Sequence, residues 1–276
     1  MTDLSPQAYA FLADVVYRRS RIRLGSDRQA FIAGRLSNRL RELGCRGYDD
    51  YCRLLNASSD DNEAERLIEL ISTNHTHFFR EPTHFEILAR DVLPKVAPRA
   101  SAAGRRLRIW SAAAASGEEA YSIAIVLAEQ PVTLLPQGWA VEASDISRRM
   151  LDRCRMGIYE AVKVDLPDPQ LLGRYFLRGF GEREGMYRVK PELRRHVSVM
   201  PINLFQPRYP LPPGQDVIFC RNVMIYFDTE SRQVLVERLF DQLTPGGFLF
   251  VGHSESLLGL RHGFRQVGPS VYERSL

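Results

Sequence analysis

The feature that most constrains the fold is the alternation of short apolar runs with helical patterns after residue 106. The apolar runs are LRIWSA, WAVEASDI, HVSVMPINL, DVIFCRN and GGFLFVGHS, and helical patterns separate most of them. Short apolar strands that alternate with helices favour βαβ units and a mostly parallel sheet. The end of the chain, FRQVGPSVYERS, has a Gly-Pro-Ser turn between two β-like runs and predicts a final hairpin. We therefore predict an α/β domain over residues 107–276.

The segments outside this alternation predict three further parts. Residues 1–90 contain amphipathic stretches and no convincing strand, so we expect a helical N-terminal domain. One predicted helix carries a stripe of apolar residues: Ile32, Leu36, Leu40 and Leu43. Residues 91–106 are rich in Pro, Ala and Arg without apolar periodicity, which predicts a linker. Residues of about 175–195 hold three glycines and a Tyr-Arg-Val alternation, which predicts a small antiparallel insertion.

Composition and length place the chain among ordinary globular proteins. Its 276 residues are 45% hydrophobic and 25% charged, enough for one domain of about 190 residues and a smaller one. No segment approaches the roughly 18 apolar residues of a membrane span. The N-terminal stretch has an early acid and no basic stretch before an apolar one, so we expect a cytoplasmic protein that does not insert into a membrane. The four cysteines form no CxxC pair, which argues against a zinc site and a disulfide framework.

The net charge of +4 is small, but the charges are segregated. Residues 18–46 hold nine arginines, whereas residues 49–69 hold seven acids. Arg28, Arg35 and Arg39 line the edge of the apolar stripe on the predicted basic helix. This pattern indicates either a surface for a polyanionic partner or an ordinary solvated helical face.

Polar residues stand at the ends of the predicted strands, where a doubly wound sheet binds its ligand. They are Ser111 with Glu118 and Glu119 shortly after it, Asp145, Asn203, and Arg221 with Asn222. Asp145 follows Gly117 by 28 residues. That is about where such folds place an acid that accepts hydrogen bonds from ribose hydroxyls. The pattern predicts a cofactor of the adenosine type.

The loop SAAAASGEE narrows the choice of cofactor. A dinucleotide requires a Gly-rich GxGxxG turn for its pyrophosphate, whereas this loop offers alanines and two carboxylates that would repel phosphate. S-adenosylmethionine has an ammonium group, a ribose and an adenine but no phosphate, so the two acids suit it. The alternative is that the small residues serve close packing and the glutamates an ordinary helix N-terminus.

The stretch NHTHFFREPTHF, residues 74–85, is a second concentration of polar residues. Its histidines place no pair at i, i+4 on a helix face, so we expect no metal site. Asn74, Thr76 and Arg80 can instead donate to a carboxylate, and the guanidinium group of Arg80 favours a bidentate pair. The alternative is that the phenylalanines of the stretch anchor it to the core and the polar residues merely lie beside them.

Six motifs in order, NHTHFFRE, WSAAAASGEEAYSIAI, ASDIS, GIY, FCRNVMIYFD and GGFLFVGHSE, closely resemble the bacterial chemotaxis receptor methyltransferases, the CheR family. The resemblance covers nearly the whole chain. It implies a helical domain, a class I Rossmann-like S-adenosylmethionine-dependent methyltransferase domain, and an inserted antiparallel β-subdomain able to grip the receptor's C-terminal tail. It also implies a monomer that methylates glutamate side chains of methyl-accepting chemotaxis receptors for sensory adaptation. The products would be glutamate methyl esters and S-adenosylhomocysteine.

The resemblance also implies roles for individual residues. Those matched to cofactor contacts are Asn74, Thr76, Arg80, Glu118, Glu119, Asp145, Asn203, Leu204, Arg221 and Asn222. Arg80 and Tyr226 are the candidates for orienting the reacting groups. The basic edge of Arg28, Arg35 and Arg39 and the tail-binding pattern of Gly179, Gly181 and Gly185 are the candidates for receptor binding. The family often has Leu and Ala where this chain has His75 and His77.

The implied chemistry requires positioning more than acid–base catalysis. A receptor glutamate with a pKa near 4.3 is ionised at pH 7, so attack on the sulfonium methyl needs no general base. Fixed geometry can contribute about 7 to 11 kcal/mol. Three alternatives remain: a nicotinamide-dependent dehydrogenase, a nucleic-acid methyltransferase, and a catalytically weak S-adenosylmethionine-binding signalling module. Because Val223 and Met224 follow Asn222 in place of the two prolines of base-amino methylases, we expect no nucleic-acid partner.

Overall fold

The structure is a computed structural model that describes residues 3–57 and 62–275. These residues form two compact units. The first comprises the described residues up to Thr73 together with Tyr226–Ser231, and the second comprises Asn74–Ile225 and the described residues from Arg232 onward. None of the described helices is long and apolar enough to span a membrane.

The first unit is helical, as predicted. Its elements are α1 (Pro6–Ser20), the short 3-10 turn η1 (Ser26–Arg28), α2 (Gln29–Glu42), α3 (Tyr48–Ala57) and α4 (Asn62–Ile71). Helix α1 begins where the hydroxyl of Ser5 accepts a hydrogen bond from the N–H of Ala8, a standard N-cap. The predicted stripe of α2 forms the core of the unit, because Ile32, Leu36 and Leu40 are almost completely buried.

The second unit contains a seven-stranded sheet in the order β6-β2-β1-β7-β8-β10-β9. Its strands are β1 (Leu107–Ala112), β2 (Trp139–Asp145), β6 (Val197–Pro201), β7 (Gln215–Cys220), β8 (Leu243–Val251), β9 (Phe264–Gly268) and β10 (Val271–Arg274). The connecting helices include α7 (Glu118–Ala128), α8 (Arg148–Met156) and α11 (Thr229–Gln242). The first five strands pair in parallel, and β9 and β10 form the predicted antiparallel hairpin. The α/β class is thereby confirmed.

Residues 91–106, expected to be a linker, contain helix α6 (Leu93–Ala102). It continues from α5 (Thr83–Ile87) through a π-helical turn, η2 (Leu88–Val92). The buried residues Leu93, Val96, Ala97 and Ala100 have the spacing of an amphipathic helix that alanines and prolines conceal in the sequence. The first proline of the segment directly follows the π-helical turn, where the regular i to i−4 hydrogen-bond pattern is already interrupted.

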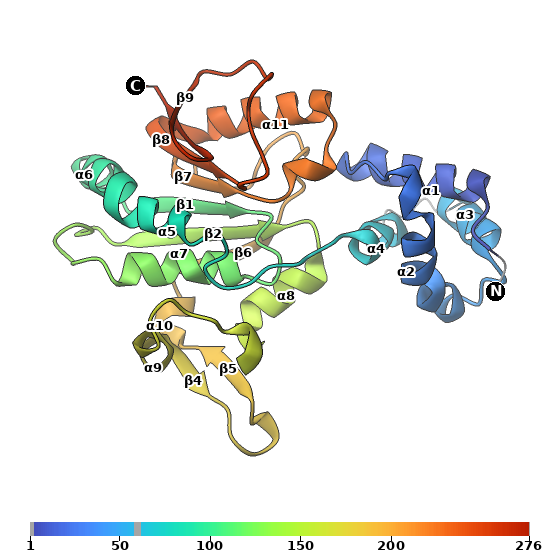
Figure 1. Cartoon of the computed structure of the whole chain (residues 1–276), viewed down its shortest axis with the longest axis horizontal. Helices are drawn as coiled ribbons and strands as arrows, with labels where there is room; N and C mark the ends of the chain where they lie inside the picture. The colour runs from blue at the N-terminus through green and yellow to red at the C-terminus, as the bar shows by residue number, and fades with distance from the viewer. Residues whose placement is uncertain (1–2, 58–61, 276) are drawn as a thin grey trace. The chain divides into compact units, whose positions relative to one another are not determined.

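A small antiparallel sheet with the order β3-β5-β4 projects from the main sheet (Figure 1). Its strands are β3 (Ile158–Glu160), β4 (Phe176–Arg178) and β5 (Met186–Val189), with α9 (Gln170–Tyr175) and α10 (Pro191–Arg194) beside them. The inserted β-subdomain is confirmed, but β3 lies upstream of the expected range of about 175–195. A three-residue strand is too short to show a period-2 pattern.

The three glycines of the insertion shape the turn between β4 and β5. A Cβ at Gly179 would lie 2.0 Å from the carbonyl oxygen of Arg183, so no larger residue fits there. Gly181 and Gly185 have φ angles of 58° and 77°, which favour glycine. The geometry of the turn therefore explains the Gly-x-Gly-x-x-x-Gly pattern. The role of these glycines in receptor binding stays a prediction.

Candidate active site

The candidate site lies at the topological switch point of the main sheet. From β1 the chain passes to β2 and β6 on one side, whereas β7 and β8 occupy the other side. All five strands are parallel, so the loops that follow them meet at one edge. In sheets of this kind the ligand binds in the crevice between the loops that diverge at the switch point. Here those are the loops after β1 and β7.

The loop after β1 requires small residues for two reasons. A Cβ at Gly117, whose φ is 97°, would lie 2.4 Å from the Sγ of Cys154. Ala113 and Ala115 also adopt left-handed conformations, with φ of 64° and 47°. Left-handed backbone costs an L-residue roughly 1–2 kcal/mol, and such strain is concentrated at functional sites. The close contact therefore requires glycine at residue 117, and the left-handed conformations at 113 and 115 exclude β-branched or bulky residues, for which such φ angles are genuine outliers.

Asp145, the predicted ribose acid, is buried at the end of β2 and holds two loops together. Its Oδ2 accepts a hydrogen bond from the N–H of Ala115 at 2.9 Å, and its Oδ1 accepts one from the N–H of Ser147 at 2.9 Å. A carboxylate offers about four acceptor positions in all. The carboxylate that the sequence assigns to ribose thus also fixes the loop after β1.

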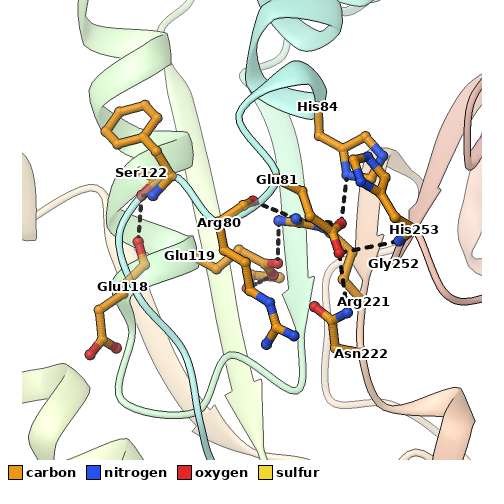
Figure 2. A network of polar contacts seen from close by, with 12 residues as sticks. Arg80, Glu81, His84, Glu118, Glu119, Ser122, Arg221, Asn222, Gly252 and His253 are labelled. Atoms are coloured by element: carbon orange, nitrogen blue, oxygen red, sulfur yellow. Dashed lines mark hydrogen bonds and ion pairs between the residues drawn. The ribbon is translucent and has the colours of Figure 1, made fainter. Parts of the chain in front are cut away.

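The two glutamates of the loop have different surroundings. Oε1 of Glu119 accepts a hydrogen bond from the Ser111 hydroxyl at 2.7 Å, and Oε2 accepts one from Arg221 at 3.1 Å. Oε2 of Glu118 accepts a hydrogen bond from the Ser116 hydroxyl at 2.7 Å and has no ion-pair partner within the described part of the chain. Burial raises the pKa of both carboxyl groups, and Arg221 opposes this rise at Glu119. Glu118, which lies apart from the Arg221 cluster in Figure 2, therefore lacks the direct ion pair that Glu119 has, and only the more distant charges of Arg153 and Lys163 oppose the rise of its pKa.

Arg221 is the centre of the polar network in Figure 2. Its side chain is only 1% exposed and donates to Glu81 at 2.7 Å, to Glu119 at 3.1 Å and to the carbonyl oxygen of Arg80. The guanidinium group also lies 5.7 Å from the centre of the Phe85 ring. Burial raises the pKa of Glu81, but the hydrogen bonds and charge of Arg221 outweigh it and lower this pKa to about 2. Arg221 thus joins the end of β7 to the loop after β1 and to residues 80–81.

Residues 74–82 are anchored by aromatic rings, so the alternative interpretation of this stretch is correct for its phenylalanines. Phe78 is buried and packs edge-on against Tyr159, with a centroid separation of 4.9 Å. Phe79 and Glu81 have left-handed backbones, with φ of 52° and 59°. The Phe79 N–H donates to the hydroxyl of Ser122 at 2.9 Å. These contacts fix the direction in which Arg80, between the two strained residues, leaves the backbone.

The polar residues of this stretch make few contacts of their own. Arg80 is partly buried, and its Nη1 donates to the carbonyl oxygen of His75 at 3.0 Å. The side chains of Asn74 and Thr76 make no hydrogen bond within the part of the chain that the structure describes. Their donor and acceptor groups are therefore available to a ligand.

The remaining predicted residues lie at other strand ends or in the first unit. Asn203 follows β6 and accepts a hydrogen bond from the N–H of Phe205 at 2.9 Å, and its neighbour Leu204 is buried. Asn222 follows β7 with a φ of 58° and donates to Glu81 at 3.3 Å. Tyr226 belongs to the first unit, so it is not placed relative to these loops.

Two acids, the half-buried Glu81 and the buried Glu255, are missed by sequence reasoning. Glu81 binds Arg221, and Glu255 accepts hydrogen bonds from backbone N–H groups of the turn after β7. Both stand at the ends of recognised motifs, FFRE and GHSE. The signal in the sequence was a charged residue beside an apolar run. Such a residue is almost never buried without a partner, so each glutamate could have been predicted to pair with another group of the site.

Among the described residues, Glu81, His84 and His253 form a group whose ligand atoms lie within 4.8 Å of one another. Nδ1 of the buried His84 lies 3.4 Å from Oε2 of Glu81, and burial lowers the pKa of His84 to about 4. The carboxylate of Glu81, however, already accepts hydrogen bonds from Arg221, Asn222 and the N–H of His253. A metal ion would compete with the guanidinium group for that carboxylate, so the donor set does not favour a metal.

The candidate receptor-binding arginines of α2 differ in their freedom. Arg39 is held by Glu63, with its Nε donating to Oε1 at 3.0 Å, and by Glu42. The guanidinium group of Arg35 lies 4.7 Å from the centre of the exposed Phe31 ring and donates to a backbone carbonyl. The acids of α4 therefore neutralise part of the basic edge, and Arg35 is its more accessible member.

The parallel sheet, the acidic and alanine-rich loop after β1 and the acid after β2 are those of an S-adenosylmethionine-dependent methyltransferase. Two family models match the chain: "CheR methyltransferase, SAM binding domain" over residues 74–272 and "CheR methyltransferase, all-alpha domain" over residues 7–72. The protein belongs to the CheR methyltransferase family. The predicted family, the enzyme class and S-adenosylmethionine as cofactor are thereby confirmed.

Curated relatives are similar along nearly the whole chain. The chemotaxis protein methyltransferase of Escherichia coli K12 is 40% identical over 272 residues, covering 99% of this chain and 92% of its own. The corresponding protein of Salmonella typhimurium LT2 is 39% identical, covering 99% and 91%. Chemotaxis protein methyltransferase 2 of Pseudomonas aeruginosa PAO1 is 40% identical, covering 93% and 89%. The crystal structure of the glycopeptide N-methyltransferase MtfA complexed with sinefungin is far more remote, at 14% identity and a TM-score of 0.33 over 58% of this chain and 49% of its own.

Proposed function

We propose that the protein transfers the methyl group of S-adenosylmethionine to glutamate side chains in the cytoplasmic domains of chemotaxis receptors and releases S-adenosylhomocysteine. The observation that carries this proposal is the 40% identity to a chemotaxis protein methyltransferase over 99% of the chain, which spans both family domains. A nucleic-acid methyltransferase and a catalytically weak signalling module are not favoured, because neither accounts for this similarity.

The cofactor is proposed to lie across the loops after β1, β2 and β6. Glu118, which makes no direct ion pair within the described residues, is the acid best suited to the α-amino group of the cofactor. Asp145 takes the ribose hydroxyls, and Asn203 with Leu204 takes the adenine side. Arg221 forms ion pairs with both Glu119 and Glu81, so these three residues are held by one another and shape the pocket.

The reaction needs the receptor carboxylate to approach the sulfonium methyl in line. The glutamate is ionised at pH 7, so the chain supplies orientation and not a base. Arg80 is proposed to orient the carboxylate, because guanidinium groups bind carboxylates in a bidentate geometry. The strained residues on either side of Arg80 and the aromatic anchors before it support this role by fixing where the side chain starts. Tyr226 is proposed as a second orienting group on the substrate side.

Arg80→Ala tests this role. The only hydrogen bond of the Arg80 side chain within the described residues goes to the carbonyl oxygen of His75, so its removal strands no buried charge. We expect a folded protein that binds cofactor but methylates receptor at least 100-fold more slowly, since misplacement at a reacting centre can cost that much. Arg90→Ala, an exposed arginine, is the matched control. Near-normal turnover of Arg80→Ala would restrict this residue to a structural role.

Receptor recognition is proposed to use two surfaces. Arg35, exposed on α2, and Arg28, half-buried in η1 just before α2, offer positive charge to an acidic receptor surface. In the small sheet, β3 and β4 are edge strands that can accept an extended receptor tail as an added strand. Phe180, in the turn after β4, is 89% exposed, and Leu177 on β4 is 47% exposed. These apolar side chains support binding of a tail that ends in an aromatic residue.

A tail peptide need not bind tightly to be useful. Tethering raises the local concentration of methylation sites to about the millimolar range, so a micromolar contact is sufficient. We expect a synthetic aromatic-ended receptor tail peptide to bind the intact protein and not a variant shortened within residues 179–185. If no native receptor tail bound the intact protein, this surface would have no part in receptor recognition.

The function as a whole is tested with radiolabelled S-adenosylmethionine and a panel of purified receptor cytoplasmic domains. Transfer of label to glutamate, released as methanol by mild base because the product is an ester, is the expected result. Label on nucleic acid in a parallel reaction would support the nucleic-acid methyltransferase. Cofactor binding without any transfer would support the non-catalytic signalling module.

A further inference from the structure

Glu255 is a buried acid, 6% exposed, whose contacts lie on the turn after β7. It follows β8 and accepts four backbone hydrogen bonds. Oε2 receives the N–H groups of Asn222 and Gly252, each at 2.7 Å. Oε1 receives those of Met224 at 2.7 Å and Ile225 at 3.3 Å. One carboxylate therefore joins the loop after β8 to the turn after β7.

The turn that Glu255 holds has a shape that needs support. Asn222 is left-handed, and a short 3-10 turn starts at Met224. The N–H groups at the start of such a turn lack internal partners, and Glu255 supplies them. The loop after β8 also packs tightly against this turn. A Cβ at Gly252 would lie 2.5 Å from the Nδ2 of Asn222 and 2.9 Å from an oxygen of Glu255. Figure 2 shows Asn222 and Gly252 on the two segments that Glu255 joins.

The turn lies between two groups of the proposed site. Arg221 precedes it and is anchored by Glu81 and Glu119, neither of which is hydrogen-bonded to Glu255 within the described residues. Tyr226 follows it directly in the chain. Glu255 thus controls the path of the backbone between the anchored arginine and the proposed orienting tyrosine.

We infer that Glu255 is a positioning residue for methyl transfer: it fixes the backbone of residues 222–225, and it acts on the alignment of the reacting groups more than on cofactor affinity. This inference rests on the proposed function. A carboxylate accepts hydrogen bonds at both oxygens, whereas the amide of glutamine accepts at only one and turns two hydrogens toward the other N–H groups. Glu255→Gln is therefore nearly the same size but cannot hold both halves of the turn.

The test compares Glu255→Gln with wild type in the full-length protein, well below the temperature at which either unfolds. We expect kcat for receptor methylation to fall at least tenfold, while the Kd for S-adenosylhomocysteine changes less than threefold. Amide hydrogen exchange, resolved by NMR, should become at least tenfold faster at Asn222, Met224 and Ile225. Asp216→Asn is the matched control, because it replaces a carboxylate that is 1% exposed at the opposite end of β7. It should lower the Tm without changing kcat of the folded protein.

A second variant covers the case in which Glu255→Gln does not fold. Gly252→Ala keeps the carboxylate but inserts a methyl group between Asn222 and Glu255, so it should give the same loss of kcat. Wild-type kcat in either folded variant, or a loss of kcat matched by an equal loss of cofactor affinity, would overturn the positioning role. Failure of the proposed function looks different: wild type itself would not methylate any receptor, and exchange at the three amides would still report whether Glu255 fixes the turn.

Discussion

The ion pair between Glu81 and Arg221 makes a strong prediction about stability. The side chain of Glu81 is 14% exposed, and its contacts with Arg221 lower its pKa to about 2. The usual value is about 4.3, and each pKa unit corresponds to about 1.36 kcal/mol. Glu81→Gln should therefore reduce the free energy of unfolding by about 3 kcal/mol at pH 7. Breaking a buried ion pair on one side costs about 3–5 kcal/mol in general, so the two estimates agree.

The pH dependence follows from the direction of the pKa change. Because the folded-state pKa of Glu81 is lowered, its stabilising contribution is complete above the unfolded pKa and is lost as pH falls through the folded pKa. The difference between wild type and Glu81→Gln should stay at about 3 kcal/mol at pH 5 and shrink to roughly half of that at pH 3. A difference that does not depend on pH would mean that the glutamine is harmful for reasons of shape.

Urea unfolding followed by tryptophan fluorescence measures this stability difference in the second compact unit, which contains Glu81. The chain has two tryptophans, Trp110 in β1 and Trp139 in β2, so the signal reports the methyltransferase unit. Glu86→Gln, an exposed acid on α5, is the matched control and should change stability by less than about 0.5 kcal/mol. A loss below 1 kcal/mol in Glu81→Gln at pH 7 would refute the view that Arg221 depends on Glu81.

Three further outcomes are expected. Asp145→Asn should weaken S-adenosylhomocysteine binding by about 1.5 to 3 kcal/mol in calorimetry, and an unchanged Kd would place the ribose elsewhere. Arg35→Glu should slow receptor methylation at low salt more than at high salt, because charges are screened beyond about 10 Å at 0.1 M. Arg41→Glu, on another face of α2, is the control and should not slow it. Equal effects of the two substitutions would mean that the basic edge is only a solvated face. Burial raises the pKa of Glu142 to about 7, so folding favours its protonated form and stability should fall as pH rises from about 4 to 7. Glu142→Gln should therefore unfold at a higher temperature than wild type at pH 8 but not at pH 4, and equal Tm differences at both would contradict this.

The sequence predicted the sheet and the helical unit because their apolar periods are strong and local. Ile32, Leu36 and Leu40 repeat with the helical period and form the core of the first unit. The strands of the main sheet are short apolar runs bounded by turns, as parallel strands buried on both faces should be. Polar residues at the strand ends marked the ligand-binding edge, because the topology alone places those ends together.

What the sequence did not predict depends on contacts between distant residues. The segment expected as a linker forms α6 because Leu93 and Val96 are buried. The prolines and alanines around them obscure this helical pattern in the sequence. The strand β3 exists only through its pairing with β5. Arg39 was assigned to receptor binding, and its pairing with Glu63, 24 residues away, could not be read from the local pattern.

The charges around the candidate site suggest why so many of its groups are paired internally. The reaction joins a sulfonium cation and a carboxylate anion and yields a neutral thioether and a neutral ester, so charge disappears on the way to the transition state. A water-excluded site favours such a change, because it stabilises separated charges less well than water does. Unpaired protein charges would oppose this by stabilising the separated reactants. Arg221 is paired with Glu81 and Glu119, and Asp145 and Glu255 accept hydrogen bonds from backbone N–H groups. Glu118 is then the acid proposed to anchor the cofactor, while the paired groups hold the geometry.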